Sequence, residues 1–282
     1  MEAVSAAKMR KAQQAAIASR AYARAASSIL ARLSGTKQAT YMALAAQRPV
    51  HNALYIVITS DKGLAGALNS AVLRATAADI AASGLSQDNV KIVAIGRKAQ
   101  DYFTARGYGI VQYYPNTDQI ESGEMEQILD IAGKRFETGN VDTVKVAYQN
   151  FVSTFEQRPT LRTVFPLSLG ELQKVVSDIV PVRGVFAHPV EPEVTPHAYS
   201  IEPSEEDVLS AVVPLLAGIF LYHALLESQA SEHSARMVSM KSASDKAVEL
   251  TDKFTLQFNK ARQASITQEI SEITGGMAAI SS

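Results

Sequence analysis

The sequence contains no cysteine among its 282 residues, which excludes disulfides, thiolate chemistry and a cysteine-based redox switch. Histidine is also scarce: the five histidines form no i,i+4 pair and no HExxH pattern, so no metal site is indicated. The nucleophile elbow GxSxG is absent as well. We therefore expect no catalytic residues, no metal and no cofactor in this chain.

Long uninterrupted hydrophobic segments are missing too. The longest apolar run, residues 208–226, contains Pro214, Gly218 and His223, and its pattern fits a helix buried by other helices better than a membrane span. The N-terminus is rich in alanine and charge, unlike a signal peptide. With a net charge of −1 and 47% hydrophobic residues, the composition predicts a folded protein that is cytosolic or peripheral to a membrane.

The N-terminal segment has an excess of positive charge. Residues 1–32 hold six basic residues against one acidic residue, Glu2. Basic helices bind nucleic acid, anionic membranes or acidic proteins. Tyr22 is the only aromatic residue there, so a base-stacking surface is disfavoured, and no large apolar face is present to enter a membrane interface. An acidic protein partner fits best, with a merely solvated face as the alternative.

The chain falls into three zones. Residues 1–33 are alanine-rich and predict a helix that ends near Gly35. Apolar runs and helical patterns then alternate up to residue 203, and this order predicts a small open sheet with helices on its faces. The predicted strands are 54–59, 90–96, 108–114 and 143–151, with an edge strand at 161–167; the predicted helices are 68–83, 97–106 and about 122–138.

The third zone, residues 204–274, predicts one very long helix. Ser204 before three acidic residues is a plausible N-cap, and Pro214 should kink or break the helix. Apolar residues then recur at steps of three and four, as in a coiled coil. A helix of this length spans about 105 Å, against about 50 Å for the N-terminal one. Part of it must therefore pair with another chain or stay unpaired, which points to a partner more than to a pocket.

These patterns together predict an α/β fold. We expect an antiparallel coiled coil of the N- and C-terminal helices, with an inserted small α/β, Rossmann-like domain. The predicted divisions are an N-terminal coiled-coil helix at residues 1–48, the α/β domain at 49–203 and a C-terminal coiled-coil helix at 204–282.

The segment SDKGLAGALN lies between a predicted strand and a predicted helix, where many proteins hold phosphate. Gly63 and Gly66 fit neither GxGxxG nor GxxxxGK[ST], and the aspartate would repel a pyrophosphate. We predict a structural turn in which these glycines let Leu64 and Leu68 pack. A nucleotide- or flavin-binding enzyme with a helical arm is the alternative, but this turn is a poor site for it. A coiled-coil adaptor would explain only the long helix.

Three segments resemble one known family. The stretch ASEHSARMVSMKSASDKAVELTDKFTLQFNKARQASITQEISEITGGMAAI, residues 230–280, closely resembles the C-terminal signature of F-type ATP synthase gamma subunits. Residues 1–13, MEAVSAAKMRKAQ, look like the N-terminal helix of that family. The turn SDKGLAGALN resembles the family's SDRGLCGGLN, and the three blocks occur in the family's order along nearly the whole chain.

The resemblance implies a function and a set of partners. It implies a non-catalytic rotor shaft that transmits rotation from the membrane c-ring to the alpha and beta catalytic subunits, and so couples proton flow to ATP synthesis or hydrolysis. The implied partners are the alpha, beta and epsilon subunits and the c-ring, with no nucleic acid. The implied location is the cytoplasmic face of a bacterial plasma membrane, where the chain is peripheral through the complex.

The resemblance also implies contact residues. Arg262 and Gln263 match family positions that hydrogen-bond to loops of the beta subunit. The implied beta-subunit contacts in the same helix also include Thr267 and Glu269; an exposed polar surface is the plain alternative. The basic residues of the N-terminal helix, Lys8, Arg10 and Lys11, would meet an acidic loop of the beta subunit.

The sequence departs from the family pattern at three places. Ala65 and Ala67 replace the usual cysteine and glycine of the turn, so a left-handed backbone at residue 67 is not expected. The cysteine-bearing loop of chloroplast members is absent, which favours a bacterial source. Family members continue the N-terminal helix before the position of Met1, so we expect that the start codon was assigned too late; a shorter upper coiled coil is the alternative.

Overall fold

The computed structural model describes residues 2–15, 18, 48–117, 122–166 and 204–280. The predicted N-terminal helix is helical over residues 2–15, and most of its remainder lies outside the described residues. The chain divides into two compact units, Met1–Met237 and Val238–Ser282. The three-part division expected from the sequence stays a prediction.

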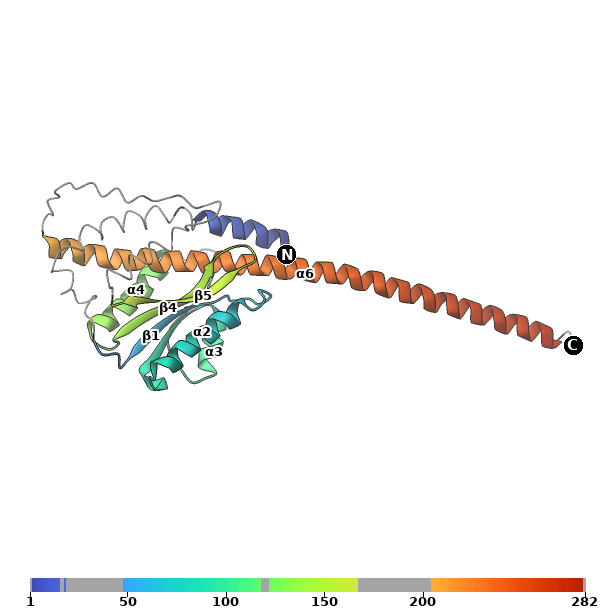
Figure 1. Ribbon diagram of the computed structural model, residues 1–282, viewed down its shortest axis with the longest axis horizontal. Coiled ribbons are helices and arrows are strands. Elements are labelled where there is room, and N and C mark those ends of the chain that lie inside the picture. The colour runs from blue at the N-terminus through green and yellow to red at the C-terminus, as the bar shows by residue number, and fades with distance from the viewer. Residues whose placement is uncertain (1, 16–17, 19–47, 118–121, 167–203, 281–282) are drawn as a thin grey trace. The chain divides into compact units, whose positions relative to one another are not determined.

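A five-stranded sheet forms the centre of the Met1–Met237 unit, in the order β3-β2-β1-β4-β5 (Figure 1). Its strands are β1 Ala53–Ile58, β2 Val90–Ile95, β3 Gly109–Tyr114, β4 Thr143–Phe151 and β5 Gln157–Phe165. The pairs β1–β2, β1–β4 and β2–β3 are parallel, and β5 is antiparallel to β4 at the edge. All five predicted strands are confirmed, including the edge strand.

The central strand β1 is buried on both faces, because all six of its residues are apolar. Successive side chains of a strand point to opposite faces, and two separate cores result. Leu54, Ile56 and Ile58 join one core, whereas Tyr55 and Val57 join the other. A continuous apolar run is the pattern expected of a central parallel strand.

Helices cover both faces of the sheet. α2 (Leu68–Ser83) and α3 (Arg97–Thr104) pack on the face of Tyr55 and Val57. α4 (Ser122–Glu137) and the first part of α6 (Glu205–Ile280) pack on the face of Leu54 and Ile56. A short 3-10 turn, η3 (Gln87–Asn89), precedes β2. The three helices predicted between the strands are thereby confirmed.

The helix α6 begins at the predicted cap. The Asp207 N–H donates to Ser204 Oγ at 3.1 Å, and that hydroxyl donates to the Asp207 carboxylate at 2.6 Å. The helix continues through Pro214, which excludes a break there, while a kink stays a prediction. It also passes Gly275 and ends at Ile280, beyond the predicted end, because neither terminal glycine takes a left-handed backbone.

The fold has its N- and C-terminal helices packed together, as expected from the sequence. In the N-terminal helical segment, Ser5, Met9 and Ala12 are buried at steps of four and three, which is one face of a helix. In α6, every residue from His223 to Ser234 is buried. Among the described residues, no helix is long and apolar enough to cross a bilayer.

Candidate functional site

The turn after β1 is closed by its own polar side chains. The Ser60 N–H donates to Asn69 Oδ1 at 3.0 Å, and the Asn69 amide donates to Ser60 Oγ at 2.7 Å. The Ser60 hydroxyl donates in turn to the Lys62 carbonyl at 2.6 Å. These hydrogen bonds join the end of β1 to the first turn of α2.

The backbone amides that open α3 are bound by the same turn. The Arg97 N–H donates to Asp61 Oδ1 at 2.8 Å, and the Ala99 N–H donates to Thr59 Oγ1 at 2.9 Å. A phosphate at a helix N-terminus would need such amides to be free. In the connection between β2 and α3, these backbone N–H groups already donate to the turn. They are not free to bind a phosphate, which disfavours a nucleotide site there.

Gly96, between β2 and α3, allows this close approach. Its φ is +93°, and a Cβ atom there would lie 2.0 Å from the Thr59 carbonyl oxygen. Only glycine fits such a position. Sequence reasoning missed this residue, although a glycine directly after the apolar strand was the available signal.

The two predicted turn glycines have different backbones. Gly66 has φ +58°, in the left-handed region, whereas the other left-handed residue of the turn is Leu64 at φ +65° and not Gly63. The expectation that Leu64 packs is wrong, since its side chain is 68% exposed at the tip of the turn. Leu68 is buried as predicted, and Ala67 has φ −84°, as the departure from the family pattern implies. A structural requirement for Gly63 stays a prediction.

The turn also contacts α6. Arg236 Nε and Nη2 each lie 3.4 Å from the Gly63 carbonyl oxygen, and Nη2 also donates to Glu232 Oε1 at 2.7 Å. The Glu232 pairing orients the guanidinium toward the turn. The turn therefore packs beside the long helix.

Other polar side chains of α6 reach strand β4 and two loops at the same edge of the sheet. They are Gln229 to the Thr117 carbonyl (2.8 Å), Ser231 to the Gln149 carbonyl (3.3 Å) and Ser234 to the Thr154 carbonyl (2.7 Å). In open α/β sheets, ligands bind outside the carboxyl ends of the strands. Here the end of β4 and the loops that follow β1, β3 and β4 hydrogen-bond to a helix. Sequence reasoning missed these residues; their only signal was polar spacing between the apolar positions.

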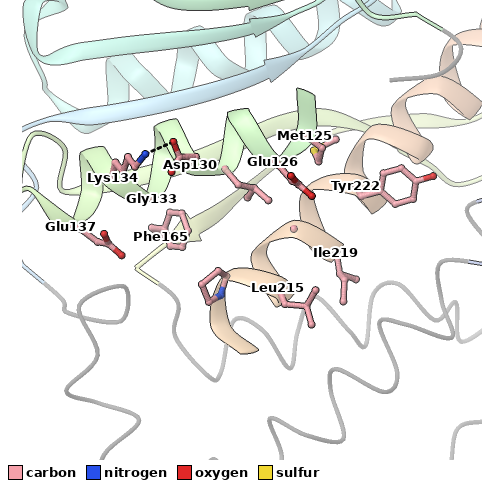
Figure 2. A pocket seen from close by; sticks show the side chains of 13 residues that line it. Met125, Glu126, Asp130, Gly133, Lys134, Glu137, Phe165, Leu215, Ile219 and Tyr222 are labelled. Carbon is pink, nitrogen blue, oxygen red and sulfur yellow. Dashed lines mark hydrogen bonds and ion pairs between the residues drawn. The ribbon is translucent and has the colours of Figure 1, made fainter. Parts of the chain in front are cut away.

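A groove of about 720 Å³ runs between α4 and α6, the two helices that pack on the face of Leu54 and Ile56 (Figure 2). Leu215, Ile219 and Tyr222 project from α6 along one side of it. Glu126 lies between the two helices, and Lys134 pairs with Asp130 at 2.7 Å on the α4 side. Sequence reasoning did not find this groove, because its two walls are far apart in the chain.

The Val238–Ser282 unit carries apolar side chains on an exposed helix. Nine large apolar residues between 248 and 277 are 48–66% exposed: Val248, Leu250, Phe254, Leu256, Phe258, Ile266, Ile270, Ile273 and Met277. Exposed apolar surface of this extent marks a protein contact site. The apolar positions predicted to recur along this helix are therefore buried from His223 to His233 and exposed from residue 241 onward.

The residues expected to contact the beta subunit are all exposed. Arg262, Gln263, Thr267 and Glu269 lie on α6, where the Thr267 hydroxyl donates to the Gln263 carbonyl at 2.9 Å. Arg262 is four residues from both Phe258 and Ile266, so its charge lies among exposed apolar side chains. In the N-terminal helical segment, the exposed basic residues are Lys8, Arg10 and Lys11. Their role as partner contacts stays a prediction.

Two of the histidines are buried in α6. His223 Nε2 lies 3.0 Å from Glu227 Oε1, one helical turn away, and His233 is buried as well. Among the described residues, no group of three or more potential metal ligands comes together. The pair is part of the helix core.

Comparison with known proteins gives one family along the whole chain. Residues 1–280 match the family model described as ATP synthase. The ATP synthase gamma chain of Opitutus terrae is 39% identical over 282 residues, which cover 100% of this chain and 92% of that protein. The ATP synthase gamma chain of Pelotomaculum thermopropionicum is 36% identical over 285 residues, covering 99% and 92%.

Solved structures share the fold. A chain of the Tetrahymena thermophila mitochondrial ATP synthase central stalk and c-ring structure matches with a TM-score of 0.60 at 22% identity, covering 86% of this chain and 97% of that one. A chain of the Euglena gracilis mitochondrial ATP synthase matches with a TM-score of 0.57 at 19% identity, covering 99% and 92%.

An α/β domain whose ligand-binding edge is taken by a helix, together with an exposed apolar helical unit, defines a subunit that works through contacts with other chains. The sequence relatives say which subunit. The chain belongs to the ATP synthase gamma chain family, a non-catalytic subunit of that complex. The resemblance seen in the sequence is thereby confirmed, and the enzyme and adaptor interpretations are set aside.

Proposed function

We propose that this chain is the rotor shaft of an ATP synthase central stalk. It transmits rotation from the c-ring to the alpha and beta subunits and couples proton flow to ATP synthesis or hydrolysis. The observation that carries the proposal is the match to gamma chains from residue 1 to residue 280. The structural relative from Tetrahymena, solved with a central stalk and c-ring, supports the same setting.

The α/β domain is the part we assign to the base of the shaft. There it meets the epsilon subunit and the c-ring, at the cytoplasmic face of a bacterial plasma membrane. Torque applied to a domain reaches a helix only if the two are rigidly joined. The hydrogen bonds from Gln229, Ser231 and Ser234, with Arg236 on the turn, supply that connection and support the proposal.

The Val238–Ser282 unit is the part we assign to the catalytic head. Its exposed apolar residues would lie against the alpha and beta subunits, and Arg262 with Gln263 would form hydrogen bonds to beta-subunit loops. A guanidinium can bind a carboxylate through two parallel hydrogen bonds, which suits a contact that depends on the angle of the shaft. Thr267 and Glu269 extend this contact by one to two turns.

Lys8, Arg10 and Lys11 are assigned a different kind of contact. Their charges would attract an acidic loop of the beta subunit without a fixed ion pair. Attraction between exposed charges is long-ranged and weakly directional, so it survives sliding better than a hydrogen bond does. Neutralising the three residues should reduce the salt dependence of torque.

Native mass spectrometry of the complex purified from its own cells, through a tag on the α/β domain, tests the assembly. The expected species holds one copy of this chain with several copies each of an alpha and a beta subunit. A chain that is isolated only as a monomer or homodimer would overturn the proposal.

The double variant Arg262→Ala/Gln263→Ala tests the contact with the beta subunit. We expect weaker ATP-driven proton pumping at an unchanged amount of assembled enzyme. The control is Asp88→Ala/Asn89→Ala, two exposed residues at η3. Pumping equal to that of wild type in the first variant would remove these two residues from the mechanism.

A further inference from the structure

The groove between α4 and α6 has one apolar wall. It comes from the side of α6 that carries Pro214, Leu215, Ile219 and Tyr222. Leu215 is 62% exposed and Tyr222 is 43% exposed. Large apolar side chains that stay this exposed beside a groove favour coverage by another apolar surface.

The floor of the groove is deepened by a missing side chain. Gly218 lies in α6, and a Cβ atom there would come within 3.1 Å of Leu129 Cδ1. Met125 and Phe165, both buried in the core, line the groove from α4 and β5. The groove therefore rests on packed side chains that do not depend on an occupant.

The opposite wall is acidic. Glu126, Asp130 and Glu137 border the groove along α4, and among the described residues that line it Lys134 is the only cation. Lys134 is already paired with Asp130. Among the described residues, neither Glu126 nor Glu137 has a cationic partner, so two carboxylates stay uncompensated on this rim.

The charge of the rim decides between possible occupants. An anionic lipid surface would be repelled by Glu126 and Glu137. A second copy docked by two-fold symmetry would place the acidic rims in the same interface, so like charges would meet. A polypeptide with basic residues beside an apolar face satisfies both walls.

We propose that the groove between α4 and α6 is the docking site of a partner polypeptide: a helical segment with one apolar face flanked by lysine or arginine. Its apolar face lies against Leu215, Ile219 and Tyr222, and its cations lie beside Glu126 and Glu137. This is the helix-in-groove mode of recognition, with charge fixing the orientation. The inference rests on the proposed function only in placing the partner within the assembled ATP synthase.

Two designed peptides test the chemistry on the full-length chain. Each is a helix of about 18 residues, five turns, with leucines at steps of three and four. One carries lysines beside the leucine face and the other carries glutamates. In fluorescence anisotropy, the lysine peptide should bind about tenfold or more tightly than the glutamate peptide, and added salt should reduce the difference.

The variant Glu126→Lys/Glu137→Lys should reverse the preference between the peptides. Both side chains are exposed, so the change leaves the core intact. The control Asp88→Lys/Asp252→Lys makes the same change in net charge at exposed positions away from the groove, and it should keep the wild-type preference. Equal binding of both peptides to the wild type, or the same preference in the rim variant, would overturn the proposal.

A photo-crosslinking amino acid at Leu215 or Tyr222 then tests the assembled enzyme. The expected adduct is a segment of another subunit with lysine or arginine next to apolar residues, read by peptide sequencing. An adduct with this chain, with a second copy or with lipid, or no adduct, would overturn the proposal. Whether alpha and beta subunits co-purify with this chain in the same sample tests the proposed function separately from the groove.

Discussion

Two stretches of α6 reverse the usual relation between polarity and burial. From His223 to Ser234 every residue is buried, yet eight of these twelve residues are polar or charged. From residue 248 to 277 the helix is exposed, yet it carries nine large apolar residues. The buried stretch is held by directed hydrogen bonds, which specify one geometry. The exposed stretch offers non-directional apolar contact, which suits the changing neighbours of the proposed rotor.

The largest expected effect is on the free energy of unfolding, when the same substitution, leucine to alanine, is made in the buried part and in the exposed part of α6. Leu221 is fully buried against the sheet, so Leu221→Ala should lower the free energy of unfolding by about 2–5 kcal/mol. Leu250 is 49% exposed, so Leu250→Ala should change it by less than about 0.5 kcal/mol. Urea denaturation of the isolated chain measures both changes in the free energy of unfolding, and hydrogen exchange at the amides of β1 checks them separately. Similar losses would contradict the division of α6 into a fixed and an exposed part.

The second effect concerns charge. Asp142 accepts hydrogen bonds from the His51 N–H at 2.8 Å and the Asn52 N–H at 2.9 Å. Burial raises its pKa, but these bonds and the nearby Arg48 outweigh burial, so the pKa is lowered. Because the folded state favours the carboxylate, its stabilisation is present above the unfolded pKa of about 3.9 and is lost as pH falls through the folded pKa.

Asp142→Asn should therefore lower the free energy of unfolding by about 2 kcal/mol near neutral pH. It should also remove the part of the acid-induced loss of stability that comes from protonation of Asp142. Glu249 is exposed beside Lys246 in the other unit, and Glu249→Gln should leave the pH profile unchanged. Thermal denaturation between pH 3 and pH 7 gives both profiles. A wild-type slope in the Asp142 variant would assign the acid sensitivity to another group.

The third effect isolates one hydrogen bond. Ser234 is fully buried and donates to the Thr154 carbonyl, so Ser234→Ala should cost about 1 kcal/mol and leave that carbonyl unsatisfied. Ser271 is exposed and donates at 2.8 Å to Thr267, within its own helix, so Ser271→Ala should be nearly neutral. Equal effects in urea denaturation would show that the bond across the sheet edge adds no stability.

The strands and the short helices could be predicted because their signals are local. The run Ala53–Ile58 is apolar at every position, and Ser204 caps α6 through a residue three positions away. The family blocks were equally visible, since they are contiguous. The α/β fold and the family could therefore be predicted from the sequence alone.

The contacts of α6 could not be predicted, because their partners are remote in the sequence. Ser231 bonds to Gln149, 82 residues away, and Arg236 contacts Gly63 at a separation of 173. The apolar pattern of α6 continues through both stretches. It therefore predicts an apolar helix face, but it does not say which part of that face packs within this chain. The left-handed backbone of Leu64 was also missed, since a leucine rarely adopts it.

The smallest expected effect compares a glycine in the exposed stretch, Gly276, with a glycine of α6 that packs against α4, Gly218. A Cβ atom at Gly276 meets nothing within 4 Å, so Gly276→Ala should stabilise the helix end by up to about 1 kcal/mol. At Gly218 the same atom meets Leu129, so Gly218→Ala should gain less or lose stability. Hydrogen exchange at the amides around each position measures the change. Reduced protection around residue 276 would mean that this end of the helix requires glycine, against the interpretation of the exposed stretch as a plain helical surface.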